Sequence, residues 1–375
     1  MQNCGPRPRL ATAALALLLA AACSDSPTAA VPEPGPPVTP PVTPPAAAGE
    51  FFNGAYLGDA ESTPERIAGA IRDFTSLSGK QPALVKTFHP LSCDFSAAGW
   101  CGQVLREVAR TGSTNYVALD LRWPGAPSTG LLDALNAGQA DAHFTRIARE
   151  LAGVPGTVLL EPGWEMNGDW NDYRWQGVAN GRDGSAPAKY AQAWRRMVGI
   201  FRAQGAANVR WVFNPNAGNP LTWRATGASH WNWYANYYPG DAYVDYVGMH
   251  GFNAPRVFNA PWASFDVLFD GDGADRMLSD LIARFPGKPV IIGEFASDEG
   301  SGDAKAEWIR AAFRRLRSHA AVAGAVWFNM TKETTWRVDS SSSALAAYRE
   351  VLADPGVKTA FAPAPAAGAN RLAMR

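Results

Sequence analysis

Eight short apolar runs alternate with amphipathic helical patterns through most of this sequence. Each run is rich in β-branched or aromatic residues and is too short for a buried helix, so we interpret each as a buried strand. Strands that alternate with helices are typical of α/β folds, and eight such units are typical of a (β/α)8 barrel. We therefore predict an α/β protein with a (β/α)8 TIM barrel as its single folded domain. The predicted strands are Phe52–Leu57, Ala83–Phe88, Tyr116–Leu121, Val158–Leu160, Val209–Phe213, Val244–Met249, Val290–Phe295 and Ala323–Phe328.

A doubly wound parallel sheet would show the same alternation. That fold binds phosphates on a glycine-rich turn after its first strand, and we find no such turn after Leu57. Helical patterns with an apolar stripe support the barrel. They begin at Thr63, Ser185 and Asp303, and a fourth runs from Phe144 to Leu151.

Residues 1–23 have the three parts of an export signal. Arg7 and Arg9 supply the positive start, the apolar run that follows is too short to span a bilayer, and small residues precede Cys23. The string Leu-Ala-Ala-Ala-Cys ending at Cys23 resembles a bacterial lipobox, although the usual aliphatic residue three positions before the cysteine is Ala20 here. We predict a lipoprotein signal with Cys23 as the lipidation site. Plain secretion is the alternative.

The two ends of the chain differ in composition from the part between them. Residues 24–49 are rich in Pro, Ala, Thr and Val, which keeps a chain extended and leaves it too little apolar surface to fold. We predict a tether there, the barrel domain over residues 50–355 and an unstructured tail over residues 356–375. We expect the protein to be exported and held at the cell envelope by the lipid anchor, or otherwise secreted.

Charge and cysteine content exclude several classes of partner and site. The 375 residues carry a formal net charge of +0, which argues against binding to nucleic acid or, apart from the lipid anchor, to a membrane surface. Cys93 and Cys101 lie beyond the leader, and their spacing is not that of a metal site. In an exported protein we expect a local disulfide between them, with two free buried thiols as the alternative. We expect a monomer and no metal.

The segment 161–170 carries a dense set of reactive and aromatic side chains. It reads Glu-Pro-Gly-Trp-Glu-Met-Asn-Gly-Asp-Trp and follows directly on a predicted strand. Glu165 stands between Trp164 and Trp170, and partial desolvation among indoles favours the protonated form of a carboxyl group. A general acid must be protonated, so Glu165 is the predicted acid. Asn167 and both tryptophans are candidate substrate contacts.

A second glutamate ends another predicted strand. Glu294 follows Val-Ile-Ile-Gly, and the glycine before it lets its carboxylate approach backbone donors that keep it ionised. The C-terminal strand ends of a barrel meet at one mouth, where active sites lie. A retaining glycosidase needs two carboxyl groups about 5–5.5 Å apart, one as acid/base and one as nucleophile. The alternative is that one glutamate is a surface residue and the other a structural ion-pair partner.

These segments resemble glycoside hydrolase family 26, the β-mannanase family of retaining (β/α)8 hydrolases. Residues 165–170 are similar to the family's acid/base motif and residues 238–248 to its lead into strand six. Residues 292–295 resemble its nucleophile strand, and residues 326–328 its strand eight. Together the resemblance covers roughly residues 50–350.

The resemblance implies roles for particular residues. Glu165 would be the acid/base and Glu294 the nucleophile. Trp170 and Trp327 would contact the sugar near the scissile bond. No metal or organic cofactor is implied.

Three positions depart from the family pattern. Trp164 stands where the family usually has His, and Glu161 where it usually has Arg. After strand six, the sequence His250-Gly-Phe252 lacks the tyrosine whose hydroxyl bonds the nucleophile. His250 could supply a hydrogen bond instead, or could pack without a functional role. His250 and Phe252, like Trp164, are kept as candidate substrate contacts.

A long connection rich in asparagine and aromatic residues follows the fifth predicted strand. An extended glycan could lie on such a loop at the barrel mouth. A loop folded on its own aromatic core is the alternative. The residues are Asn214, Asn216, Asn219, Trp223, Trp231, Trp233, Tyr234 and Tyr237.

The sequence therefore predicts a retaining endo-β-glycosidase that cleaves a β-linked polysaccharide by double displacement. β-1,4-Mannan is the first substrate by resemblance, with mixed-linkage β-glucan or β-xylan next. A surface glycan-binding protein on a barrel without catalysis is the rival from another class. A barrel hydrolase acting on an ester or amide is a third reading, but we find no Gly-x-Ser-x-Gly nucleophile elbow.

Overall fold

The computed structural model describes residues 50–170, 173–217, 230–271 and 277–363. The chain divides after Thr39, and all of the described residues belong to the second unit, Pro40–Arg375. The predicted export signal, Cys23 and the tether lie outside the described residues. Among the residues described, no helix is long and apolar enough to cross a bilayer.

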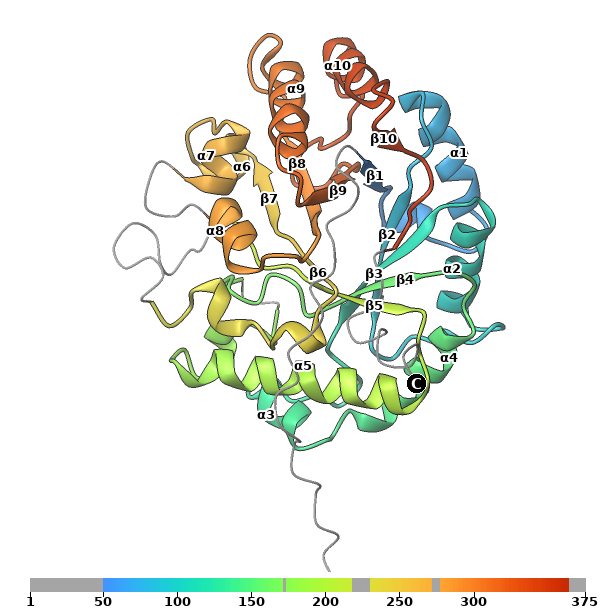
Figure 1. Cartoon of the computed structure of the whole chain (residues 1–375), viewed down its shortest axis with the longest axis vertical. Helices are drawn as coiled ribbons and strands as arrows, with labels where there is room; N and C mark the ends of the chain where they lie inside the picture. The colour runs from blue at the N-terminus through green and yellow to red at the C-terminus, as the bar shows by residue number, and fades with distance from the viewer. Residues whose placement is uncertain (1–49, 171–172, 218–229, 272–276, 364–375) are drawn as a thin grey trace, which may run out of the picture. The chain divides into compact units, whose positions relative to one another are not determined.

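Parallel strands form a closed barrel in the second unit (Figure 1). They follow one another around the ring in chain order, and β9 pairs with both β8 and β1 and so closes it. The sixth strand of the barrel is interrupted at Gly248 and Met249. It therefore consists of two short strands, β6 and β7, which both pair with β8. The strands are β1 Phe51–Tyr56, β2 Leu84–Pro90, β3 Thr114–Asp120, β4 Val158–Pro162, β5 Val209–Phe213, β6 Tyr246–Val247, β7 His250–Asn253, β8 Val290–Ser297 and β9 Val322–Phe328.

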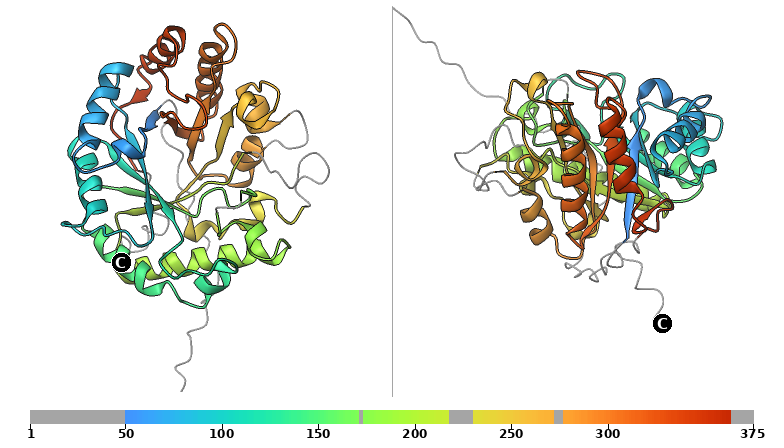
Figure 2. Two further views of the ribbon diagram at one scale, coloured as in Figure 1. Left: turned by 180° about the vertical axis from the view of Figure 1, so that it is seen from behind. Right: turned by 90° about the horizontal axis from the view of Figure 1, so that it is seen from above.

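Helices surround the barrel, as both views in Figure 2 show. The (β/α)8 prediction is confirmed, and each predicted strand overlaps an observed one. The α-helices are α1 Ile67–Ser78, α2 Trp100–Arg110, α3 Leu131–Asn136, α4 Asp141–Ala152, α5 Ser185–Ala203, α6 Pro255–Phe258, α7 Phe265–Asp270, α8 Met277–Arg284, α9 Ala304–Arg317 and α10 Ser342–Leu352.

The predicted helix starts are confirmed except for the first. α5 begins at Ser185, and Asp303 is the residue that precedes α9. α1 begins at Ile67 rather than at Thr63. The residues between them form a turn, in which the Thr63 carbonyl accepts a hydrogen bond from the Ile67 amide at 3.0 Å.

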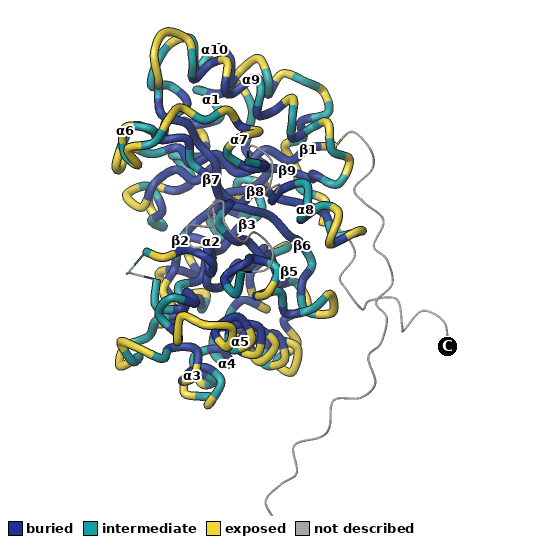
Figure 3. The backbone as a smooth tube through the Cα atoms, turned by 90° about the vertical axis from the view of Figure 1, so that its left-hand side faces the viewer, coloured by how far each residue is buried: buried dark blue, intermediate teal, exposed yellow. Residues whose placement is uncertain are grey.

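Two apolar layers hold the barrel together, and the strands between them are buried (Figure 3). The outer layer lies between the strands and the helices. The inner layer fills the N-terminal half of the barrel and includes Leu84 and Leu159. Residues two positions further along a strand point to the same face. Lys86 and Glu161 therefore point into the barrel, on the side of this apolar layer that is nearer to the C-terminal ends of the strands.

The predicted boundary of the tail is wrong. β10, Val357–Lys358, pairs with the start of β1. The Phe361 ring then packs against Phe52 and Tyr246, with ring centroids 4.8 Å and 5.9 Å apart. Phe361 thus packs against the inner apolar layer at the N-terminal end of the barrel, so the folded domain extends at least to residue 361.

The predicted disulfide is confirmed. Cys93 and Cys101 are bonded, with their Cα atoms 6.2 Å apart. The bond ties the loop after β2 to the start of α2. His89 lies beside it, with Nδ1 2.9 Å from the Cys101 sulfur.

Candidate active site

Four strands bring charged side chains together inside the C-terminal half of the barrel. Lys86 comes from β2, Glu161 from β4, His250 from β7 and Glu294 from β8. His250 and Glu294 are register partners on neighbouring strands. All four are buried, with at most 4% of their surface exposed. We call these four residues the central cluster.

Glu165 lies above the central cluster, in the loop that follows β4. Its backbone has a φ of 52°, a left-handed conformation that is uncommon for residues other than glycine. Hydrogen bonds on both sides hold it there. The Glu165 amide donates to the Asn214 carbonyl at 2.9 Å, and its own carbonyl accepts from the Gln176 side chain at 2.9 Å. Such a position persists only where the surroundings fix it, and it is common at functional sites.

The Glu165 carboxylate has a partner on each oxygen. The Trp170 indole N–H donates to Oε2 at 2.8 Å. His250 Nδ1 lies 3.1 Å from Oε1. The residue is 6% exposed, so the group is nearly but not fully closed to solvent.

Glu294 shares the same imidazole nitrogen. Its Oε1 lies 3.6 Å from His250 Nδ1 and 2.7 Å from Lys86 Nζ. The structure thus brings together the two glutamates that the strand ends suggested, although they are 129 positions apart in the sequence. They meet at His250, and each keeps a small exposed fraction, 6% for Glu165 and 4% for Glu294.

Burial and neighbouring charges shift the pKa values of the central cluster. Burial raises the pKa of Glu294, and His250 and Lys86 only partly oppose this. Burial acts the same way on Glu161, but there Lys86 and His250 prevail and lower its pKa. Burial by itself would lower the pKa of His250, yet Glu294 and Glu161 raise it to about 9. His250 is therefore an imidazolium at neutral pH.

A metal ion does not fit the central cluster. Glu161, His250 and Glu294 offer ligand atoms within 4.8 Å of one another. The Lys86 ammonium, however, contacts both carboxylates and lies 3.2 Å from His250 Nε2. The protein's own cation occupies the position that a metal would take.

The other candidate substrate contacts in the loop after β4 mainly stabilise the loop itself. Asn167 is buried and fixes the loop, because its amide pairs with the Asn216 backbone at 2.8 Å and 3.0 Å. Trp164 is 6% exposed and packs edge-on against Phe88 and Trp175. Trp170 is the partly exposed member of this group, and it reaches Glu165 directly.

Trp327 does not reach the site. Its neighbour Val326 points into the barrel, so Trp327 points outward. There it is fully buried against Trp308 of α9 and Tyr348 of α10. We therefore correct its expected role from sugar contact to core packing. Phe252 is half-buried and packs on Phe328 and Trp336 at the C-terminal end of the barrel.

The aromatic connection after β5 folds partly on itself. Trp233, Tyr234 and Tyr237 are buried, while Trp231 remains half-buried. The first three thus support the alternative of an aromatic core. Asn219 and Trp223 lie outside the described residues.

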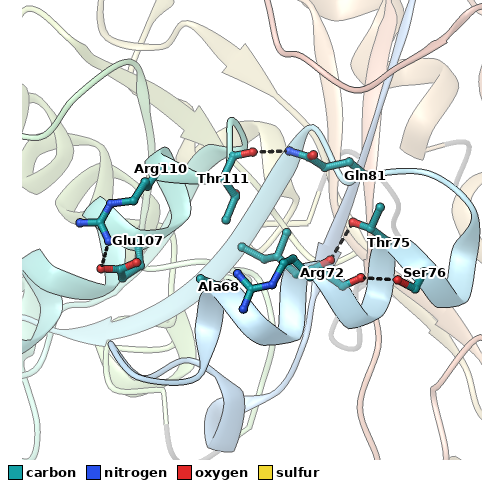
Figure 4. A pocket seen from close by; sticks show the side chains of 9 residues that line it. Ala68, Arg72, Thr75, Ser76, Gln81, Glu107, Arg110 and Thr111 are labelled. Atoms are coloured by element: carbon teal, nitrogen blue, oxygen red, sulfur yellow. Dashed lines mark hydrogen bonds and ion pairs between the residues drawn. The ribbon is translucent and has the colours of Figure 1, made fainter.

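A surface pocket elsewhere does not belong to this site (Figure 4). It lies between α1 and α2 and is lined by residues that include Arg72, Gln81, Glu107 and Arg110. Gln81 precedes β2 and therefore marks the N-terminal end of the barrel, opposite to the strand ends that carry the glutamates. The Gln81 side chain already donates to the Thr111 carbonyl at 2.7 Å.

Sequence reasoning missed Lys86 and treated Glu161 only as a departure from a pattern. A signal for both exists. Each follows an inward-pointing leucine by two positions, Leu84 and Leu159, so each must also point inward. Two opposite charges predicted to face one barrel interior are expected to pair.

A closed parallel barrel with two glutamates meeting at the C-terminal strand ends defines the class of barrel glycoside hydrolases. Comparison with known proteins gives the family. Residues 140–269 match the model of glycosyl hydrolase family 26. The matched range includes residues 165–170, whose motif resembles the same family.

Two curated relatives show the range of named activities. Endoglucanase H of Acetivibrio thermocellus is 38% identical over 302 residues, which cover 80% of this chain and 30% of that protein. A mannan endo-1,4-beta-mannosidase of Bacillus subtilis is 24% identical over 235 residues, covering 54% of this chain and 56% of that protein. The chain thus spans less than two thirds of the length of either relative.

Solved structures agree on the fold. The catalytic domain of a GH26 endo-beta-1,4-mannanase from Bacillus sp. JAMB-750 superposes with a TM-score of 0.58 at 18% identity, over 82% of this chain and 87% of that one. The GH26 domain of an endo-beta-mannanase/endo-beta-glucanase from Prevotella bryantii gives 0.54 at 15% identity, over 82% and 90%.

Proposed function

We propose that this protein is a retaining endo-β-glycosidase whose nucleophile is Glu294 and whose acid/base is Glu165. One observation carries the proposal: both carboxylates lie within 3.6 Å of the same nitrogen, His250 Nδ1, with Glu165 in the loop after β4 and Glu294 within β8. A shared contact keeps the two carboxyl groups close together, and close carboxyl groups, about 5–5.5 Å apart, are typical of retaining rather than inverting glycosidases.

The reaction would proceed in two displacements. Glu294 attacks the anomeric carbon while Glu165 gives its proton to the leaving glycosidic oxygen, so that one C–O bond forms as the other breaks. Glu165, now ionised, then takes a proton from water, and the resulting hydroxide displaces Glu294 from the sugar. The products are two shorter chains, and the enzyme returns to its starting protonation state.

The surroundings support these roles. Trp170 donates a hydrogen bond to Glu165, which fixes its orientation toward a bound chain. Lys86 contacts Glu294 at 2.7 Å, and its positive charge favours the ionised form that a nucleophile needs.

For the substrate we propose a β-glucan first and β-1,4-mannan second. The relative with 38% identity is named an endoglucanase, whereas the mannosidases are 24% and 26% identical. The three departures at Trp164, Glu161 and Phe252 lie at positions where the mannanase-type pattern has other residues. They therefore also argue against simple transfer of the mannanase activity.

A reducing-sugar assay of the purified full chain tests the proposal. The panel is mixed-linkage β-glucan, β-mannan, β-xylan and cellulose, assayed with Glu294→Gln and with the matched control Glu107→Gln. We expect release from one polymer, loss of about 10³-fold or more in Glu294→Gln and no change in the control. Binding without release on every polymer would favour the glycan-binding protein, and full activity of Glu294→Gln would remove Glu294 as the nucleophile.

We further propose that the protein is an exported monomer anchored through a lipid on Cys23, with a polysaccharide as its partner. The signal-like composition of residues 1–23 and the Pro-rich segment after it support this. Detergent phase partitioning of the expressed full chain, compared with Cys23→Ala, tests it. We expect wild type in the detergent phase and the variant in the aqueous phase. Wild type in the aqueous phase would favour plain secretion.

A further inference from the structure

Two of the positions that depart from the family pattern meet in the central cluster. Glu161 stands in place of an arginine, and His250 lies on the strand that lacks the tyrosine hydroxyl. In the structure their side chains touch, with His250 Nε2 2.7 Å from Glu161 Oε1. Lys86 completes the arrangement from the facing side of the barrel. The departures are therefore not independent losses. They are parts of one charged array, by which we mean the central cluster together with Glu165.

Lys86 is positioned by three oxygen partners and lies close to a fourth group, the His250 ring, whose positive charge does not attract it. Its ammonium pairs with Glu161 Oε2 and lies 2.7 Å from Glu294 Oε1. It also donates to the Gly293 carbonyl at 3.3 Å and lies 3.2 Å from His250 Nε2. An ammonium has three protons to donate, so it can hold Glu161, Glu294 and the Gly293 backbone at the same time.

His250 links Glu161 to the two proposed catalytic glutamates. An imidazolium carries a proton on each nitrogen. The Nε2 proton faces Glu161, and the Nδ1 proton faces Glu165 and Glu294. A single ring thus contacts three carboxylates from two strands and a loop.

We infer that Lys86 and His250 are positioning residues that hold Glu294 and Glu165 in place, and that Glu161 fixes both cations. This inference rests on the proposed function. Glu161 touches neither proposed catalytic carboxylate directly, and it acts through Lys86 on one side and through His250 on the other.

The charges of the array balance in the state that the reaction needs. Lys86 and the His250 imidazolium carry two positive charges, and Glu161 and Glu294 carry two negative ones. The titratable groups around this interior include Tyr56 from β1, Lys86 from β2, Tyr116 from β3, Glu161 from β4, Glu165 and Tyr173 after β4, His250 from β7 and Glu294 from β8.

Stability alone does not explain the array. Buried ion pairs are often no more stabilising than apolar residues of similar volume. The same strands carry apolar side chains one layer below, at Leu84 and Leu159, where the barrel is filled without charge. Charge is thus confined to the layer that contacts the two glutamates.

The protonation state of His250 can be tested without any activity. The chain has five histidines, so ¹⁵N imidazole signals in NMR can be assigned with His250→Gln. We expect both His250 nitrogens to remain protonated at pH 8 in wild type, whereas the pKa values of His89, His143 and His319 are shifted downward. In Glu161→Gln, the His250 midpoint should fall by about 1 unit or more. A neutral His250 at pH 7 in wild type, or an unchanged midpoint in Glu161→Gln, would overturn the inference.

Kinetics test the positioning role. We expect Glu161→Gln to lower kcat by about 100-fold with a KM within a factor of about three, because Glu161 is fully buried and is not open to a bound chain. His89→Gln is the matched control, since His89 is equally buried but lies outside the barrel interior, beside the disulfide. Wild-type kcat in Glu161→Gln, with the variant folded by circular dichroism, would overturn the inference.

The two experiments separate this inference from the proposed function. If wild type cleaves no polymer while His250 titrates as expected, the proposed function is wrong. The effect of Glu161 on the protonation of His250 would still hold. If wild type is active but Glu161→Gln is unchanged in both the NMR titration and kcat, the positioning role fails and the proposed function stands.

Discussion

At the scale of single residues, the buried pair of Lys86 and Glu161 is the most sensitive point of the barrel interior. Both side chains are at most 1% exposed, and each neutralises the other. Removing one partner of a buried pair leaves an uncompensated charge, whereas removing both does not. The stability of variants should therefore be strongly non-additive.

We expect Lys86→Met to lower the free energy of unfolding by about 3–5 kcal/mol, because it leaves Glu161 buried without its ammonium. The double variant Lys86→Met/Glu161→Gln should recover most of that loss. Urea denaturation of the wild type, both single variants and the double variant measures the coupling. Additive losses in the double variant would show that the two residues do not depend on each other.

The pH dependence of the reaction follows from Glu294. Its pKa is raised above the ordinary value of 4.5, because burial outweighs the attraction of His250 and Lys86. The nucleophile must be ionised, so activity is present above its pKa and is lost as the pH falls through it. We expect the acid limb of kcat/KM on an uncharged polysaccharide to lie above pH 4.5. Full activity at pH values below 4.5 would contradict this assignment.

The sequence makes some of these residues visible and hides others. Glu294 stands out because it directly follows an apolar run and a glycine, and Glu165 because it lies among tryptophans shortly after another apolar run. Lys86 does not stand out, because its inward direction is visible only when it is compared with Leu84, two positions before it on the same strand. Trp327 was misassigned for a different reason: its aromatic character fits a sugar contact, but strand alternation turns it outward.

At the scale of elements, β8 depends on a glycine next to the central cluster. A Cβ atom at Gly293 would lie 2.1 Å from Asn214 Nδ2, 2.6 Å from His250 Nε2 and 2.7 Å from the Tyr116 hydroxyl. These are distances that side chains avoid, so β8 can pass this point only without a side chain. The register shift between β8 and β9 at the same place fits this crowding.

We expect Gly293→Ala to lower kcat by about 100-fold, because His250 must move and the two glutamates lose their shared contact. Gly199→Ala in α5 is the matched control, since a Cβ there meets nothing within 4 Å. The control should keep wild-type kcat and gain stability by up to about 1 kcal/mol from helix propensity. Equal activity of both variants would mean that β8 tolerates a side chain beside the cluster.

At the scale of the whole molecule, strand count and order could be predicted, but the closure at the base could not. Eight apolar runs predict eight barrel strands. Their alternation with helices predicts that neighbouring strands are parallel and follow chain order. The segment 356–363 was assigned to the tail because its composition resembles a linker. The roles of Val357 and Phe361 depend on contacts that only the folded barrel provides. Val357 pairs with Phe51 of β1, and Phe361 packs against Phe52.

Truncation after residue 355 should therefore lower the melting temperature. It removes the β10 pairing and the Phe361 ring, and each kcal/mol lost shifts Tm by about 2–4 °C in a domain of this size class. Differential scanning calorimetry of the truncated chain, beside a truncation after residue 363, measures the effect. Identical melting temperatures of the two truncated chains would mean that the folded domain ends at residue 355.

The identity of the nucleophile is the central claim, and covalent trapping tests it most directly. A 2-deoxy-2-fluoro-β-cellobioside with a dinitrophenol leaving group slows the second displacement, so that the glycosyl-enzyme accumulates. Peptide mass spectrometry then locates the sugar. We predict one added glycosyl unit on the peptide that contains Glu294, and none in Glu294→Gln. A label on another residue, or inversion of the anomeric configuration during turnover of the natural polymer, would contradict the proposed mechanism.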